Sequence, residues 1–132
     1  LWVIHDHENI LDLAHGRKRR PADGAYEDMP PVRHPLVRLH PVTKRRCLFL
    51  SPHTMARVEG LSENDGRTLL DEIIAHATED RFVYRHVWTK DDVIMWDNRS
   101  TMHAVEPFDN RTVRRIMHRV TLVGEERPIP AV

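Results

Sequence analysis

Residues 113–123 read VRRIMHRVTLV, and this stretch decides the fold that we expect. Because the side chains of a strand point alternately to its two faces, the stretch divides into two sets. One set is Val113, Arg115, Met117, Arg119 and Thr121, and the other is Arg114, Ile116, His118, Val120 and Leu122. Arg115 and Arg119 would then share one face, roughly 13 Å apart at about 3.3 Å per residue. The stretch therefore predicts a strand that carries an arginine pair.

Two interpretations of this arginine pair remain open at this point. In the first, the arginines face solvent, and Ile116, Val120 and Leu122 belong to the core. In the second, the sheet encloses a cavity, where each inward guanidinium needs an anion as its partner. A histidine beside two buried arginines would then indicate a metal ion bound together with carboxylate-bearing ligands.

Working outward from this stretch, the remaining chain shows further strand patterns. The expected strands are 82–88, 93–96 with an extension through 101–105, and 36–40 and 47–50, the last two joined as a hairpin by 41–46. Asp97, Asn98 and Arg99 interrupt the pattern with residues that favour turns. We expect a mainly β fold with flanking helices.

Two helices are expected beside these strands. Apolar spacing over residues 1–16 predicts an amphipathic helix that ends near Gly16, and Pro, Gly and charged residues make 17–33 a loop. Ser62 is suited to cap a second helix, with Asp65 returning the bond in a capping box. The buried stripe of this second helix would be Leu69, Leu70, Ile73, Ile74 and Ala77.

The composition limits the classes of function. The 132 residues include 20 Lys and Arg, 20 Asp and Glu, and a formal net charge of +0, which argues against nonspecific binding to nucleic acid or anionic membranes. Cys47 is the single cysteine, so neither an intrachain disulfide nor a cysteine-based zinc or iron–sulfur site is expected. A reducing, cytoplasmic location fits best, and the apolar runs are too short for a membrane span.

Two strings in this order resemble the C-terminal end of the TauD/TfdA family of Fe(II)- and 2-oxoglutarate-dependent dioxygenases. They are Trp96-Asp97-Asn98-Arg99-Ser100-Thr101-Met102-His103 and Arg114-Arg115-Ile116-Met117-His118-Arg119-Val120-Thr121. The hairpin that follows His34 and the helix around 69–77 resemble the family as well. The resemblance implies that 1–132 is the C-terminal part of such a domain, with a barrel segment at 34–124, a tail at 125–132 and an incomplete double-stranded β-helix (jelly-roll, cupin-like) fold.

The resemblance also implies roles for four residues of this chain. His103 falls on an iron-binding histidine of the family, and Arg115 falls on the arginine that pairs with 2-oxoglutarate. Arg119 falls on the arginine that holds the carboxylate or sulfonate of the substrate, and Trp96 would line the iron pocket. No residue of the chain is expected to act as a catalytic acid, base or nucleophile. A planar guanidinium suits both anion-binding roles because it binds carboxylates in a bidentate way.

The other two iron ligands of the family come from a His-x-Asp or His-x-Glu motif that this chain lacks. His5-Asp6-His7-Glu8 sits on the expected first helix, where adjacent residues face different ways, so it is not expected to replace the motif. The remaining separated histidines are expected to bind no metal: His34, His40, His53, His76 and His86. We therefore expect the missing ligands outside the chain, and the 132 residues alone to be inactive.

In its full-length context, the chain would belong to an enzyme that uses Fe(II), O₂ and 2-oxoglutarate as cosubstrate. The enzyme would hydroxylate a small anionic organic substrate, releasing succinate and CO₂, and would form a homo-oligomer without nucleic-acid or membrane partners. The alternatives are a non-catalytic anion-binding β module that uses the two arginines without iron, and an inactive fragment.

Overall fold

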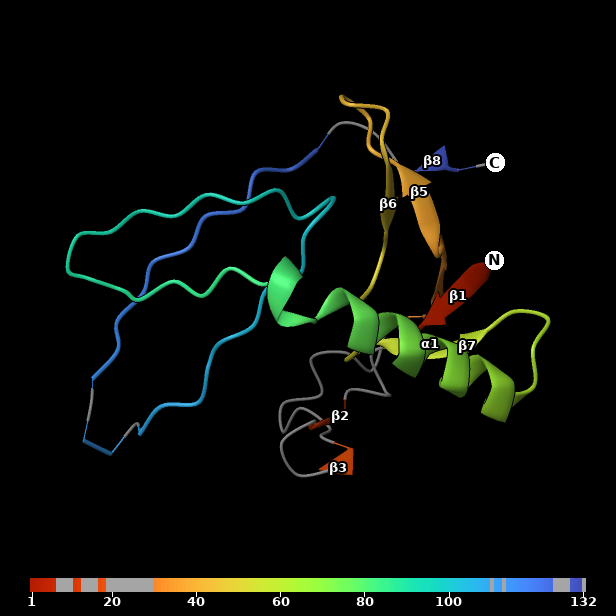
Figure 1. The fold of residues 1–132 in the computed structure, drawn as a ribbon, viewed down its shortest axis with the longest axis horizontal. Coiled ribbons are helices and arrows are strands. Elements are labelled where there is room, and N and C mark those ends of the chain that lie inside the picture. The colour runs from red at the N-terminus through yellow and green to blue at the C-terminus, as the bar shows by residue number, and fades with distance from the viewer. Residues whose placement is uncertain are drawn as a thin grey trace.

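The computed structural model describes most of the chain. The residues described are 1–6, 11–12, 17–18, 30–109, 111–112, 114–124 and 129–131. In chain order, the elements are β1 (Trp2–His5), β2 (Leu11–Asp12), β3 (Arg17–Lys18), β4 (Val32–Pro35), β5 (Val37–Leu39), β6 (Arg46–Leu48), β7 (Met55–Val58), α1 (Glu63–Ala77), η2 (Asp80–Phe82) and β8 (Ile129–Pro130). The elements are mostly short strands, with one α-helix (Figure 1). No helix in the described part is long and apolar enough to cross a bilayer.

Two antiparallel three-stranded sheets organise the molecule. In the first, β1 lies between β4 and β7, and in the second, β5 lies between β6 and β8. The hairpin predicted from residues 36–50 is confirmed, because Val37 pairs with Leu48 and Leu39 with Arg46. A third, separate pair joins β2 to β3. Strand β8 lies in the segment predicted as a tail, and it returns the chain to the edge of β5.

The core lies between the first sheet and the helix. Its buried apolar side chains are Val3, Leu36, Leu50, Met55, Val58 and Leu70. Ile73, Ile74 and Ala77 of α1 pack against this cluster, as the apolar stripe predicted. The helix begins as expected, because the Ser62 hydroxyl oxygen accepts a bond from the Asp65 amide. Ser62 Oγ also donates to the Asp65 carboxylate at 2.7 Å, so the side-chain half of the capping box differs from the expected one.

The predicted N-terminal helix is wrong at residues 2–5. These residues form β1, with Val3 and His5 buried and Trp2 and Ile4 half-buried. This two-residue alternation fits a central strand, and β1 indeed pairs with a strand on each side. The loop predicted at 17–33 is also interrupted by β3 and by the start of β4. Residues 11–12 of the predicted helix form strand β2, so the prediction is wrong there too, and residues 7–10 and 13–16 lie outside the described residues.

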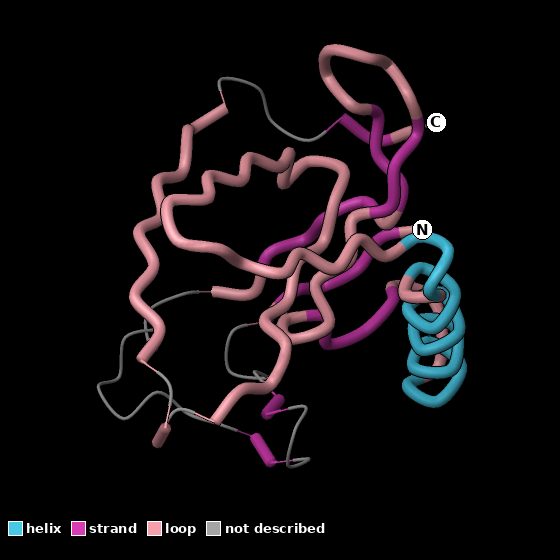
Figure 2. The backbone as a smooth tube through the Cα atoms, turned by 60° about the vertical axis from the view of Figure 1, so that its left-hand side comes forward, coloured by secondary structure: helices cyan, strands magenta, loops and turns pink. Residues whose placement is uncertain are grey.

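Residues 83–124, which we call the distal segment, contain no strand among their described residues. The strands predicted at 82–88, 93–96, 101–105 and 113–123 are therefore not observed, and Asp80–Phe82 is a short 3₁₀ helix. Figures 1 and 2 show the distal segment as long loops that extend away from α1. Because a strand needs hydrogen bonds from a neighbouring strand, β-prone sequence alone does not produce a ladder here.

Candidate functional site

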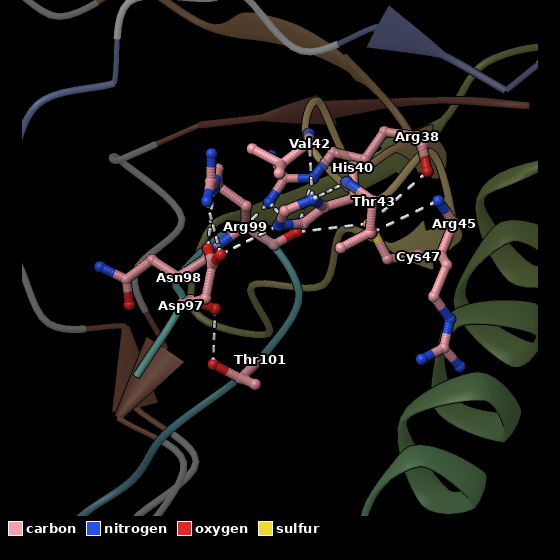
Figure 3. Close-up of polar contacts among 10 residues, drawn as sticks. All are labelled: Arg38, His40, Val42, Thr43, Arg45, Cys47, Asp97, Asn98, Arg99 and Thr101. Atoms are coloured by element: carbon pink, nitrogen blue, oxygen red, sulfur yellow. Dashed lines mark hydrogen bonds and ion pairs between the residues drawn. The ribbon is translucent and has the colours of Figure 1, made fainter. Parts of the chain in front are cut away.

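Residues 97–101 of the distal segment form a turn that is held by its own side chains (Figure 3). The Arg99 amide donates to Asp97 Oδ1 at 2.9 Å, and the Arg99 guanidinium donates to both carboxylate oxygens at 2.8 and 2.7 Å. The Thr101 hydroxyl donates to the Asp97 carbonyl oxygen at 2.7 Å. The turn chemistry predicted at Asp97–Arg99 is thus confirmed, and local bonds define the shape of the turn.

The side chain of Arg38, in β5, binds the backbone of this turn. Its Nε and Nη2 atoms donate to the Arg99 carbonyl oxygen at 3.0 and 2.6 Å, and Nη2 also donates to the Asn98 carbonyl oxygen at 3.3 Å. The guanidinium carbon lies 4.3 Å from the centre of the Phe49 ring. Arg38 is only 8% exposed, and its charge is balanced here by carbonyl dipoles and an aromatic face.

His40 binds the same turn through the Asp97 side chain. Its Nδ1 atom accepts bonds from the amides of Val42 at 3.3 Å and Thr43 at 3.1 Å. An accepting Nδ1 carries no proton, so the proton lies on Nε2, which donates to Asp97 Oδ2 at 2.9 Å. The hairpin loop therefore selects the imidazole tautomer that can hold Asp97.

The same contacts set the charge state of Asp97. Hydrogen bonds from the Arg99 side chain, then from His40, and then from the Arg99 backbone lower the pKa of the Asp97 carboxyl far below its usual value. All of these donors stabilise the ionised form. Asp97 is therefore a carboxylate throughout the neutral range, and its negative charge lies between the imidazole and the Arg99 guanidinium.

His103 lies two residues beyond this turn, next to Trp96. The centres of the two rings are 4.8 Å apart. The Trp96 indole nitrogen donates to Asn98 Oδ1 at 2.8 Å, which ties the indole back to the turn. The structure thus brings together Trp96 and His103, two of the residues that sequence analysis placed near one site, and it leaves the His103 side chain exposed.

The two arginines predicted to bind anions are both exposed. The Arg115 guanidinium carbon lies 5.7 Å from the centre of the Phe108 ring. Neither arginine forms a hydrogen bond or an ion pair with another residue that the structure describes. Because residues 114–124 form no strand, the shared face of Arg115 and Arg119 stays a prediction.

The structure gives a limited set of possible metal ligands. Within the described ranges, no three side chains of His, Cys, Asp or Glu gather closely enough to hold an ion. His5 is buried in β1 and its Nδ1 lies 2.9 Å from the Thr54 hydroxyl oxygen. His7 and Glu8 lie outside the described residues. The described residues do not by themselves form a complete iron site.

Sequence analysis missed the role of Arg38 and His40. His40 was treated as an isolated histidine, although it directly follows β5 and lies two residues after Arg38. Their partners lie 57 to 61 positions further along the chain. A pattern of periodicity carries no information on a contact at that separation.

Comparison with known proteins identifies the family to which this chain is similar. Residues 5–121 match the family described as taurine catabolism dioxygenase TauD, TfdA family. The chain is 37% identical, over 123 residues, to an alpha-ketoglutarate-dependent 2,4-dichlorophenoxyacetate dioxygenase from Burkholderia sp. (strain RASC), covering 93% of this chain and 39% of that protein. It is 34% identical, over 131 residues, to an alpha-ketoglutarate-dependent sulfate ester dioxygenase from Pseudomonas putida, covering 95% of this chain and 42% of that protein.

A solved structure agrees with these relatives. The crystal structure of AAD-2 in complex with Mn(II) and N-oxalylglycine matches this chain with a TM-score of 0.73 and 35% sequence identity. The match covers 86% of this chain and 44% of that one. The chain therefore spans about two fifths of the length of these relatives. It belongs to the TauD/TfdA family of Fe(II)- and 2-oxoglutarate-dependent dioxygenases.

Proposed function

We propose that this chain is the C-terminal part of a 2-oxoglutarate-dependent dioxygenase that hydroxylates a small anionic organic substrate. The observation that carries the proposal is the anchored turn at 97–101, which presents His103 beside Trp96 inside the region that matches the family. Residues 34–124 would supply one segment of a double-stranded β-helix. The similarity to AAD-2 over 86% of this chain but 44% of the other supports a partial domain.

His103 is the residue that we assign to the metal. Iron oxygenases bind Fe(II) with two histidines and one carboxylate on one face. This chain would contribute one imidazole, in its neutral form, and Trp96 would form part of the wall beside it. The other two ligands would come from residues outside this chain, so the 132 residues alone would neither hold Fe(II) tightly nor turn over.

The two arginines divide the remaining anions between them. Arg115 would pair with a carboxylate of 2-oxoglutarate, and Arg119 would pair with the carboxylate or sulfonate of the substrate. Both guanidiniums stay charged at any pH of interest and offer paired donors. The relatives named above act on a phenoxyacetate and on sulfate esters, which are both anionic, and this agreement supports a substrate of the same class.

The reaction would consume O₂ and 2-oxoglutarate and release succinate and CO₂ along with the hydroxylated product. The full-length protein would act in the cytoplasm as a homo-oligomer, without a nucleic-acid or membrane partner. The balanced charge and the single cysteine of this chain support that setting.

The experiment uses the longest natural polypeptide that contains these residues, with Fe(II), 2-oxoglutarate and either a phenoxyacetate or an alkyl sulfate ester. His103→Ala should abolish succinate formation and Fe(II) binding, while the matched control His118→Ala should keep both. Arg115→Ala should raise the 2-oxoglutarate requirement. Arg119→Ala should mainly raise the substrate requirement and leave substrate-free 2-oxoglutarate decay largely intact.

Three outcomes would contradict the proposal. Normal turnover by His103→Ala together with loss in His118→Ala would mean that the wrong histidine is assigned. Equal effects of both arginine changes on both ligands would remove the division of roles. If every variant binds 2-oxoglutarate and the substrate with undiminished affinity, and binding does not depend on iron, a non-catalytic anion-binding module is favoured.

A further inference from the structure

We infer that Arg38 and His40 form a positioning clamp for His103. The clamp is defined as these two side chains with their contacts to Asp97, Asn98 and Arg99. The inference rests on the proposed function, because it deepens the role given to His103. It assigns no catalytic part to the clamp, since neither side chain is placed against a reacting group.

The first argument is that the clamp attaches the distal segment to the second sheet. Among the described residues, the hydrogen bonds seen between the distal segment and the β5–β6 hairpin end at residues 97–99 (Figure 3). Arg38 holds two carbonyl oxygens of the turn, and His40 holds its carboxylate. Two buried side chains, Arg38 of β5 and His40 directly after it, thus bind backbone and side chain of the same turn.

The second argument is that the histidine is itself prepared for this contact. The amides of Val42 and Thr43 both donate to Nδ1. This leaves a hydrogen only on Nε2, where Asp97 accepts it. His40 is 7% exposed, so water competes little for the bond. The hairpin loop fixes the ring, and the ring then fixes the turn.

The third argument is that the path from the turn to His103 is short and bonded. Thr101 is tied to the Asp97 carbonyl oxygen, and Trp96 is tied to Asn98. The Trp96 indole in turn lies against the His103 imidazole, with the ring centres 4.8 Å apart. Because most of the distal segment lacks a strand partner, this anchored path is what places an exposed His103 relative to the sheet. Displacement of a binding group by about 1 Å is enough to weaken a site strongly.

The test uses the whole 132-residue chain and follows Cys47, its single cysteine. Cys47 is half-exposed, and its Sγ lies within donating distance of the Arg99 carbonyl oxygen at 3.4 Å and of the Arg38 carbonyl oxygen at 3.5 Å, so release of the turn removes the first of these acceptors and should increase access to the thiol. Reaction with an aromatic disulfide reagent is timed at neutral pH, with the circular dichroism of α1 as a check on folding. This readout does not depend on iron, on 2-oxoglutarate or on turnover.

Two substitutions at His40 separate the clamp from general packing. His40→Asn keeps an acceptor near the loop amides but loses the donor to Asp97, so labelling of Cys47 should be at least about tenfold faster. His40→Gln carries an amide N–H at nearly the same reach as Nε2 but loses the acceptor for the loop amides, so its labelling should be markedly slower than that of His40→Asn and somewhat faster than that of the unchanged chain. Arg38→Lys keeps the charge but lacks the planar fork, and it should also label faster.

The matched control is Arg45→Met, because Arg45 is an exposed arginine in the same hairpin (Figure 3). Its side chain makes no contact with the clamp among the described residues, so its labelling rate should not change. A second readout is the proton NMR chemical shift of the His103 ring. The Trp96 ring, whose centre lies 4.8 Å from that of His103, changes this shift by its ring current. The ring-current contribution to the His103 shift should be lost in His40→Asn and should return in His40→Gln.

The outcomes distinguish this inference from the proposed function. If His40→Asn and Arg38→Lys stay folded, label at the original rate and keep the His103 signal, the clamp does not position His103. That result would leave the proposed function intact, provided that His103→Ala still abolishes turnover in the natural polypeptide. If both clamp variants release the turn but His103→Ala is fully active, the inference about the clamp is supported and the metal-binding role of His103 is wrong.

Discussion

The packed part of the molecule, residues 1–6 and 30–82, and the distal segment, residues 83–124, use similar residues to opposite effect. In the packed part, apolar side chains such as Val58 and Leu70 are buried between strands and the helix. In the distal segment, Val93 and Val120 remain exposed. Both parts are rich in β-branched and aromatic residues, so strand propensity does not distinguish them. What distinguishes them is a neighbour that supplies hydrogen bonds and an apolar face.

The clamp is where the distal segment is bonded to the β5–β6 hairpin of the packed part. Its residues are polar, buried on the hairpin side and bonded to a turn on the other side. The distal segment is therefore not uniform. The turn at 97–101 is bonded to the hairpin, whereas the stretches on either side of it carry mainly local bonds, such as those of His86 and Thr89 with Asp92. The candidate metal ligand lies beside the defined turn, where position is best controlled.

The largest effect that would test this comparison is on the free energy of unfolding. Leu70 is 1% exposed in the core, whereas Val120 is 86% exposed. Leu70→Ala should cost about 2–5 kcal/mol, because it removes buried methyl groups and leaves a cavity. Val120→Ala should change stability by no more than about 0.5 kcal/mol. Urea unfolding followed by the circular dichroism of α1 measures both, and comparable losses would erase the distinction between the two regions.

A smaller effect concerns pH and the joint between the regions. The pKa of Asp97 is lowered in the folded chain, so its ionised form stabilises the attachment. That contribution is present above the ordinary aspartate pKa of about 3.9 and is lost only as pH falls through the lowered value. An NMR titration of the Asp97 carboxyl carbon should therefore show a carboxylate that is still ionised at about pH 3.9, where a free aspartate is half protonated.

The control for this titration is Arg99→Met, because Arg99 is the largest cause of the lowered pKa. In that variant, the pKa of Asp97 should rise toward the ordinary value, and the remaining shift should reflect His40 and the backbone amide of residue 99. A midpoint at the ordinary value in the unchanged chain would mean that the turn does not hold its carboxylate as the structure shows.

Sequence patterns predicted the elements whose partners are close in the chain. The hairpin of β5 and β6 and the helix that Ser62 caps both depend on local spacing, and both are confirmed. The helix prediction was wrong at residues 2–5 because a stretch of four residues cannot distinguish a helical period from an alternating one. Their identity as a central strand depends on β4 and β7, which lie about thirty and fifty positions away. Strand β7 was not predicted at all.

The same limit applies to the candidate site. The turn residues and the neighbourhood of Trp96 and His103 follow from a local motif, so they could be predicted. Arg38 and His40 could not be connected to that turn, since their contacts span more than fifty positions. The strands predicted in the distal segment show the converse problem. Their pattern is present, but nothing in the pattern itself supplies the second strand that a ladder requires.

The smallest effect expected is a gain in stability confined to the packed part. Gly66 lies in the first turns of α1, where a Cβ would meet Val58 atoms at 3.5 Å, an ordinary contact distance. Because alanine favours the helix over glycine and restricts the unfolded chain, Gly66→Ala should raise the unfolding free energy by about 0.4–1 kcal/mol. Gly60→Ala is the matched control, since Gly60 has open space but a φ of +80° that strains any side chain, and it should destabilise. Urea unfolding measures both changes. If the two regions are as independent as their packing indicates, Gly66→Ala should leave the labelling rate of Cys47 unchanged, whereas slower labelling would mean that stability of the helix is transmitted to the clamp.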